Sequence, residues 1–319
     1  MSFSSLTYII YPLQNILNIC DYKSYLGALI MGNILVLTDF SENSFRAAEW
    51  ALLFAEKSRA SLVIYHSYLG VPVIPYDTYT GQHFEPEPLV RIDDELKKTL
   101  SEFAERLEET AAQNDSIDFK PVIETELGEG NLGVNVKELV EKKNIELVVM
   151  GSTGKTNLGR LLMGNRITEV IEKIETPVLI VPLQSRPAQL KKVTFAVNFD
   201  GSEIHAFHLL AHLSERFGFS TEVVHVITAG ENYDDGAKRV LMEKLNNGNR
   251  IVNLGYHAVR GRSVLSRLNR ECKKNGCDLL AMTHRQYSLL QRMFHKSTTR
   301  AALHDQKLPL LIFPSRPTA

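Results

Sequence analysis

The chain has 319 residues, of which 44% are hydrophobic, and its 36 Lys and Arg residues nearly balance its 37 Asp and Glu residues. This length suits about two domains of roughly 150 residues, each able to bury a core. The balanced charge excludes the basic surplus of a nucleic-acid-binding protein, and three cysteines without a C-x-x-C pair predict reduced thiols in a cytoplasmic protein.

Residues 1–30 differ from the rest of the chain. They are apolar and aromatic, but they lack a positively charged start and a small-residue cleavage site, which argues against a signal peptide. Pro12 and several polar residues interrupt the run, so it is too short and too polar to span a bilayer. We expect either that the natural start is Met31 or that residues 1–30 form a loosely attached extension. An apolar helix that seeks a surface is the alternative.

The first half alternates between apolar strands and helical segments. Strands are expected at about 33–38, 61–66, 119–126, 146–150 and 178–181, and their unbroken apolar runs are typical of a parallel sheet that is buried on both faces. Ser41 or Asn43 is expected to cap the first helix. The buried face of that helix is predicted to consist of Ala47, Ala48, Ala51, Leu52 and Ala55.

The second half repeats this pattern. ILVLTDFSE (34–42) matches FAVNFDGSE (195–203), which aligns Asp39 with Asp200, and LVIYHS (62–67) matches EVVHVI (222–227), which aligns His66 with His225. ELVVM (146–150) and TPVLIVP (176–182) match DLLAM (278–282) and LPLLIFP (308–314). The spacing between matched segments shortens once, which indicates a deletion in the second half opposite residues 68–94.

These elements predict an α/β fold with two tandem doubly wound, Rossmann-like five-stranded parallel-sheet domains. The expected divisions are an extension at 1–30, a first domain at 31–184 and a second domain at 191–316. Ligands of such sheets bind beyond the carboxyl ends of the strands. The residues that directly follow each strand are therefore the candidates for a site.

A glycine-rich stretch follows the fourth strand. Its spacing is Gly151-x2-Gly154-x9-Gly164-Asn165, and it leads from a strand into a helix. Glycines let the backbone approach an anion, and free N–H groups at a helix start favour negative charge. The first half therefore contains a candidate phosphate seat. In the second half the glycine positions are taken by Thr283, Gln286 and Lys296.

This pattern resembles the universal stress protein family, in which nucleotide-binding members carry a G-x2-G-x9-G-(Ser/Thr) motif after the fourth strand. The fold it implies is adenine nucleotide alpha hydrolase-like, in the tandem two-domain type. The resemblance implies that Thr38 and Asp39 contact adenosine and that Ser67 lines the adenine pocket. Met150 and the other motif residues would hold ribose and phosphates, namely Gly151, Gly154, Gly164 and Asn165. One departure is that Asn165 replaces the family's hydroxyl residue.

The implied function is a stress-response regulator that binds ATP, with or without Mg²⁺, or another adenine nucleotide in its first domain. Two alternatives remain: a nucleotide-free, chaperone-like structural protein, and a slow ATPase or self-phosphorylating enzyme. No nucleophile–base pair supports catalysis, so we expect no catalytic residues. His205, His208 and His212 share a helix face, but no acid or cysteine completes a metal site.

Two look-alike motifs carry less weight. Gly154-Lys155-Thr156 ends like a P-loop, but position 149 is Val149 rather than glycine. The stretch 128–133 spells G-x-G-x-x-G, yet it follows the third strand and no acidic residue closes the next strand. We expect it to form a turn and a tight helix start.

The resemblance also implies pairing of the two last strands, near 178–182 and 310–313, across a pseudo-two-fold axis. The chain would then form internally the dimer that single-domain relatives form between chains, and a further homodimer is an open alternative. Neither nucleic acid nor a membrane is an expected partner.

Overall fold

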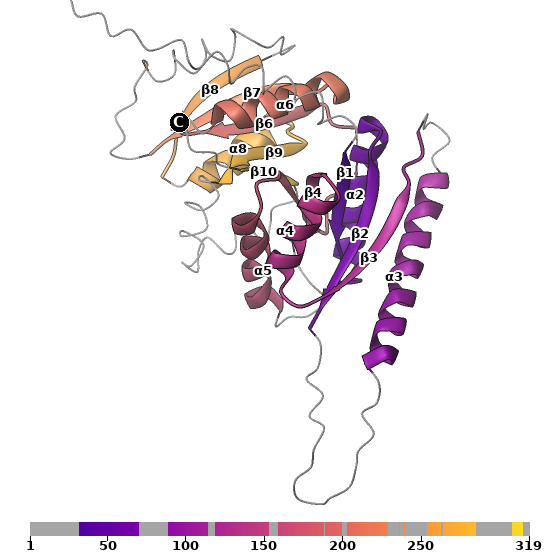
Figure 1. The fold of residues 1–319 in the computed structure, drawn as a ribbon. Helices are drawn as coiled ribbons and strands as arrows, with labels where there is room; N and C mark the ends of the chain where they lie inside the picture. Colours follow the sequence, from indigo (N-terminus) through magenta and orange to yellow (C-terminus); the bar gives the residue numbers. More distant parts are fainter. Residues whose placement is uncertain are drawn as a thin grey trace, which may run out of the picture.

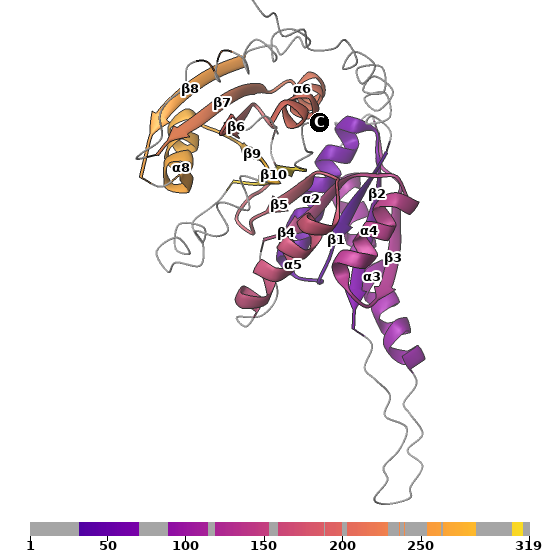
Figure 2. The same cartoon turned by 60° about the vertical axis from the view of Figure 1, so that its left-hand side comes forward.

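The computed structural model describes residues 32–69, 89–113, 119–152, 159–187, 189–199, 203–228, 254–262, 264–284 and 308–314, together with 236 and 239. Within these ranges the chain forms an α/β structure around a ten-stranded sheet (Figures 1 and 2). The extension 1–30 and most of the segment 68–94 lie outside the described residues. No helix among the described residues is long and apolar enough to cross a membrane.

The first half contains five strands that alternate with helices. The elements are β1 (Asn33–Leu37), α2 (Glu42–Ser58), β2 (Ser61–Tyr68), α3 (Leu89–Ala112), β3 (Ile123–Glu129), α4 (Leu132–Lys142), β4 (Ile145–Gly151), α5 (Gly159–Lys173) and β5 (Val178–Val181). The predicted strands are confirmed, with one correction: β3 begins at Ile123 rather than at 119. Pro121, which has no N–H to give to a neighbouring strand, lies just before this start.

The described part of the second half contains β6 (Lys192–Val197), α6 (Glu203–Phe217), β7 (Ser220–Ile227), β8 (Leu254–Arg260), α8 (Val264–Asn275), β9 (Leu279–Thr283) and β10 (Leu310–Phe313). The strand order of the whole sheet is β3-β2-β1-β4-β5-β10-β9-β6-β7-β8. Counted inward from each edge, β8-β7-β6-β9-β10 repeats the order β3-β2-β1-β4-β5. The same winding therefore occurs in both halves.

The two halves meet through β5 and β10. These strands pair antiparallel, with Leu179 opposite Leu311, whereas the other pairs in the sheet are parallel. A two-fold relation between the halves requires this reversal of direction. The predicted pairing of the last strands is confirmed, and it merges the two expected five-stranded sheets into one.

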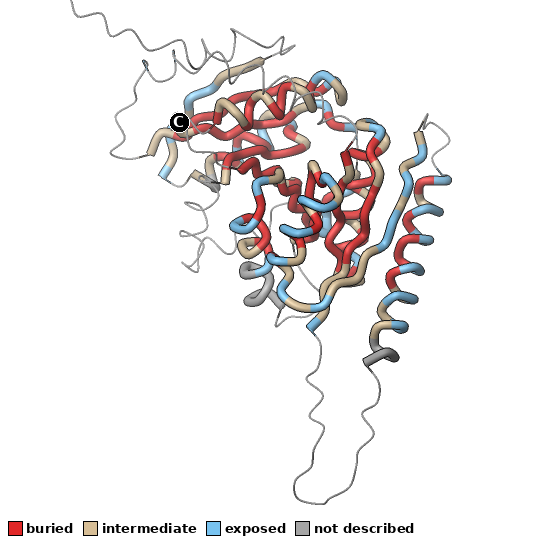
Figure 3. Tube along the Cα trace, in the orientation of Figure 1, coloured by how far each residue is buried: buried red, intermediate tan, exposed pale blue. Residues whose placement is uncertain are grey.

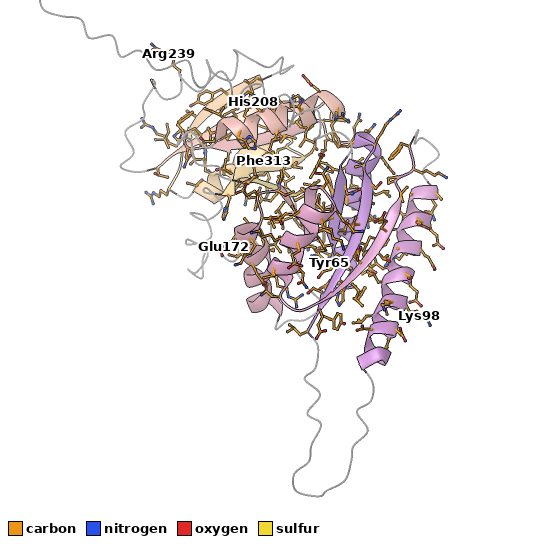
Figure 4. The ribbon with its side chains drawn as sticks, in the orientation of Figure 1. Tyr65, Lys98, Glu172, His208, Arg239 and Phe313 are labelled. Atoms are coloured by element: carbon orange, nitrogen blue, oxygen red, sulfur yellow. The ribbon has the colours of Figure 1, made fainter. Side chains whose placement is uncertain are left out.

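Helices cover both faces of the sheet. The core on one face joins β-strand residues to α2, α3 and α6, and the cores on the other face involve α4 and α5 in the first half and α8 in the second. Figure 3 shows the buried central strands between these layers. Phe313 of β10 is fully buried at the junction of the halves (Figure 4), and its ring centroid lies 6.4 Å from that of the buried Phe195 on β6.

Helix α2 begins and packs as its sequence predicts. The Ser41 hydroxyl caps it by accepting the backbone N–H of Ser44 at 3.2 Å, whereas Asn43, the alternative cap, lies inside the first turn. The predicted alanine-rich face is buried. It rests on the sheet and on α6, where the rings of Phe54 and Phe217 lie 4.8 Å apart between centroids.

Candidate functional site

The candidate residues from the first half gather where the winding of the sheet reverses. β1 lies between β2 and β4, and Leu37 at the end of β1 is paired with Met150 near the end of β4. Crossovers leave these neighbouring strands toward opposite faces, which opens a crevice beyond their carboxyl ends. Thr38 and Asp39 follow β1 at this crevice, and Gly151 ends β4 there.

Thr38 organises the turn between β1 and α2. It is buried, its N–H donates to the carbonyl oxygen of Tyr65 at 2.9 Å, and its hydroxyl lies 3.0 Å from the hydroxyl of Ser44. The hydroxyl oxygen also accepts the N–H of Phe40 at 3.0 Å. These contacts fix the backbone that carries Asp39.

Asp39 is half-buried and already has a structural task. Its Oδ1 atom accepts the backbone N–H of Ser41 at 3.1 Å and the hydroxyl of the same residue. Such a bond from an aspartate to the backbone two residues later stabilises a tight turn. Asp39 thus supports the helix cap, and contact with a nucleoside stays a prediction.

Phe40 adopts a backbone conformation that is uncommon for a side-chain-bearing residue, with φ at 60°. Its ring lies 4.3 Å from the His66 ring, and Nδ1 of His66 lies 2.7 Å from the carbonyl oxygen of Thr38. His66 of β2 therefore stabilises the turn between β1 and α2. The sequence singled out His66 only as the counterpart of His225, and its position at the end of the second strand was the available signal for its role in the turn.

Met150 and Gly151 are the last two residues of β4, at the switch point. Met150 is buried in the core formed with α4 and α5. A Cβ atom at Gly151 would lie 2.5 Å from Nδ2 of Asn43 and 3.1 Å from its backbone carbon. The glycine is needed because the first turn of α2 packs directly on the end of β4. Sequence reasoning missed this role of Asn43, because nothing local in the sequence marks it.

The remaining motif residues are only partly described. Gly154 lies outside the described residues. Gly164 and Asn165 lie within α5, which begins at Gly159, and their side chains are not described. Their contacts with phosphates therefore stay predictions.

Ser67 lies near the end of β2, opposite Gly128 of β3. Its hydroxyl donates to the carbonyl oxygen of Gly130 at 3.1 Å, and the N–H of Gly130 donates to the carbonyl oxygen of Tyr68 at 2.8 Å. Gly130, with φ at 110°, makes the predicted turn before α4, which Asn131 caps. Ser67 thus contacts the β3–α4 connection, and its role in an adenine pocket stays a prediction.

The second half repeats the turn but not its chemistry. Nδ1 of His225 lies 2.9 Å from the carbonyl oxygen of Val197, and Phe199, with φ at 62°, has its ring 4.6 Å from the His225 ring. Val197 therefore takes the place of Thr38, and Asn198 takes the place of Asp39.

The alignment of Asp39 with Asp200 is accordingly wrong. Helix α2 begins at Glu42, the second residue after Phe40, whereas α6 begins at Glu203, the fourth residue after Phe199. The extra residues displace the aspartate along the connection; Asp200 itself lies outside the described residues.

Thr283 occupies the position of Gly151, as the alignment predicts. It is paired with Phe313 of β10, just as Gly151 is paired with Val181 of β5. Thr283 is fully buried, so the second half has a side chain at the position where the first half has a glycine packed against Asn43. Gln286 and Lys296, the other residues aligned with the glycines, lie outside the described residues.

A separate cavity lies at the opposite end of the sheet. Its volume is about 50 Å³, and it lies between the starts of β1 and β4 and the helices α2 and α6. Glu146 is its charged lining residue, and burial raises the pKa of this carboxyl from 4.5 to about 7. Because the cavity is at the amino ends of the strands, it is not part of the crevice.

Comparison with known proteins identifies relatives of the first half in particular. The model of the universal stress protein family matches residues 31–182. A universal stress protein of Methanocaldococcus jannaschii is 31% identical over 155 residues, which cover 49% of this chain and 84% of the relative. One from Bacillus subtilis is 29% identical over 154 residues, which cover 48% of this chain and 99% of the relative.

Structural similarity extends over both halves. The crystal structure of a universal stress protein from Archaeoglobus fulgidus covers 89% of this chain and 96% of its own, with a TM-score of 0.62. The sequence identity in this comparison is 18%, so the similarity concerns the fold alone.

Proposed function

Since the chain belongs to the universal stress protein family, we propose that it is a stress-response regulator that binds ATP or another adenine nucleotide in its first domain. The regulatory output would be read by a partner that senses whether the site is occupied. The proposal includes the divisions expected from sequence, with a first domain at 31–184 and a second at 191–316.

One observation carries the proposal. Four of the residues selected from sequence lie at the switch point between β1 and β4, which is where doubly wound sheets bind their ligands. Thr38 and Asp39 arrive from one strand, and Met150 and Gly151 arrive from the other. A nucleoside in this crevice would direct its phosphates toward the segment that follows β4.

The glycine motif completes the proposed site. The backbone N–H groups after Gly151, around Gly154, and at the start of α5 would receive the phosphates, since the amino end of a helix favours negative charge. Gly164 and Asn165 are proposed to help hold the outer phosphates. In the second half, Thr283 fills the first glycine position, and Val197 and Asn198 replace the polar pair that follows β1. These differences support binding in the first half alone.

A nucleotide extraction tests the proposal directly. Freshly purified full-length protein is denatured, and the released small molecules are identified by chromatography and mass spectrometry. Protein freed of ligand is then titrated with ATP and Mg²⁺ while its thermal midpoint is followed. Ligand at 100 times its Kd should add about 2.7 kcal/mol of stability.

Matched valine variants locate the site. Gly154→Val places a side chain in the proposed phosphate path and should abolish the thermal shift. Gln286→Val, at the aligned position of the second half, should leave it unchanged. An absent shift in the parent protein would favour the nucleotide-free structural alternative, and equal binding by Gly154→Val would refute the placement. Incubation with labelled ATP separates binding from turnover, because hydrolysis or a phosphoprotein would instead favour the enzyme alternative.

A further inference from the structure

Helix α8 ends in a turn that brings two cysteines together. Gly276, which follows the last helical residue, has φ at 65°, and the N–H of Cys277 donates to the carbonyl oxygen of Cys272 at 2.9 Å. This six-residue closure is a Schellman motif, in which the side chains at the two closing positions meet. The motif brings Cys272 and Cys277 close together although they are five positions apart in the chain, and both belong to the same buried cluster.

Both thiols are free and buried. Cys272 is 1% exposed and Cys277 is 6% exposed, and both belong to the core between α8 and the sheet. The Cys277 thiol donates a hydrogen bond to the carbonyl oxygen of Leu279 at 3.0 Å. The neighbouring Cys272 thiol lowers the pKa of the Cys277 thiol, whereas the neighbouring Cys277 and burial raise the pKa of the Cys272 thiol.

The chain over this pair faces solvent. Lys273, Lys274 and Gly276, which lie between the two cysteines, are exposed. Local opening of a helix end costs less than global unfolding, and the oxidation proposed below requires such an opening to expose the two buried sulfurs. The two lysines add positive charge, which favours approach of an anionic small disulfide such as oxidised glutathione.

We propose that Cys272 and Cys277 form a reversible oxidation site, which small-molecule disulfides convert into an intramolecular disulfide at the end of α8. The thiolate of Cys277 attacks one sulfur of the reagent, so that a mixed disulfide forms and one small thiolate leaves. Cys272 then gives up its proton and attacks the sulfur of Cys277, which releases the second small thiol. The protein loses two electrons and two protons, and the small disulfide gains them.

Because the two cysteines are neighbours, closure of the intramolecular disulfide is favoured over a product in which the small thiol stays attached to Cys277. A disulfide requires Cβ atoms roughly 4 Å apart, and the backbone bond that closes the turn brings the two cysteines together. The site lies in the second half, away from the β1–β4 crevice, so it is independent of the proposed nucleotide site.

The test uses the full-length Cys20→Ser protein, in which these are the two remaining cysteines. The folded protein is equilibrated with oxidised glutathione, alkylated and digested with trypsin without reduction. Trypsin cuts after Arg270, Lys273 and Lys274, so the cysteines fall in separate peptides, ECK (271–273) and NGCDLLAMTHR (275–285). The expected product is these two peptides joined by a disulfide, with an intact mass lower by two hydrogens, and dithiothreitol should reverse it.

Two outcomes would overturn the proposal. One is that both cysteines of the folded protein stay alkylatable under glutathione conditions that oxidise the same chain in urea. The other concerns the double variant that combines Cys20→Ser with Cys272→Ser. This variant should carry one glutathione on Cys277. If Cys277 stays unmodified while the Cys20→Ser protein forms the disulfide, Cys277 is not the attacking thiol.

Discussion

Nδ1 of His66 lies 2.7 Å from the carbonyl oxygen of Thr38, which ties the end of β2 to the turn that follows β1. The same histidine packs its ring on Phe40, whose positive φ reverses the chain toward α2. Asp39 lies between the two residues that His66 contacts. The orientation of this aspartate therefore depends on a side chain from the neighbouring strand.

Replacing this histidine should weaken both the fold and ligand binding. His66→Leu removes a partly buried hydrogen bond and should lower the free energy of unfolding by about 1 kcal/mol. Because the turn that carries Asp39 loses its support, affinity for an adenine nucleotide should fall roughly tenfold, or about 1.4 kcal/mol. Urea unfolding and nucleotide titration measure the two effects separately.

His225→Leu is the matched control, since His225 makes the corresponding bond to Val197 at 2.9 Å. It should lower stability by a similar amount while nucleotide affinity stays unchanged. An equal loss of affinity in both variants would mean that the effect on binding is a general consequence of instability.

Much of this fold follows from local patterns. The continuous apolar runs identified the strands because a strand that is buried on both faces carries apolar residues on both, without the usual alternation with polar residues. Ser41 was a predictable cap because its hydroxyl acts on a backbone N–H three residues away. The pairing of β5 with β10 was predicted from a family resemblance rather than from any property of those strands.

Other features depend on long-range packing that no local pattern records. The match between the two sequence segments favoured Asp200 as the counterpart of Asp39. The strand register and the contact from His225 instead make Asn198 the equivalent residue. The sequence also presents Gly151 as a phosphate residue. Its tight contact with Asn43 arises only when α2 folds back over β4, so packing alone is a sufficient reason for that glycine.

A substitution at Gly151 tests this packing requirement. The Cβ atom of Gly151→Ala would lie 2.5 Å from Nδ2 and 3.1 Å from the backbone carbon of Asn43, and the backbone of a helix start cannot yield easily. We expect a loss of about 1–3 kcal/mol in the free energy of unfolding. Gly255→Ala is the control, because its Cβ would meet its nearest neighbour, Glu222, at 3.8 Å. Equal urea midpoints for the two variants would show that the contact at Gly151 is relaxed in solution.

Two substitutions at Asp39 separate its turn-forming role from its proposed ligand role. Asp39→Asn keeps an oxygen that can accept the N–H of Ser41, so stability should stay within about 0.5 kcal/mol of the parent. Loss of the charge should still weaken nucleotide binding by about 1.5 kcal/mol or more, the usual value of a hydrogen bond to a charged group. Asp39→Ala should lose both the binding contact and about 1 kcal/mol of stability. Full nucleotide affinity in Asp39→Asn would exclude a role for the charge.

The carboxyl of Glu146 should make stability depend on pH. Burial raises its pKa from the ordinary value of 4.5 to about 7, and the N–H of Gly32 and the charge of Arg216 only partly oppose this shift. Between these two pH values the folded protein keeps a proton that the unfolded chain releases. Rising pH therefore favours the unfolded state, and the free energy of unfolding should fall across this window. Glu146→Gln, which is neutral throughout, should flatten the decline when urea midpoints are measured below and above the window.

Glu141→Gln, at an exposed position of α4, is the control and should keep the parent's fall in stability with rising pH. If stability falls as steeply in Glu146→Gln as in the parent, other groups cause the pH dependence.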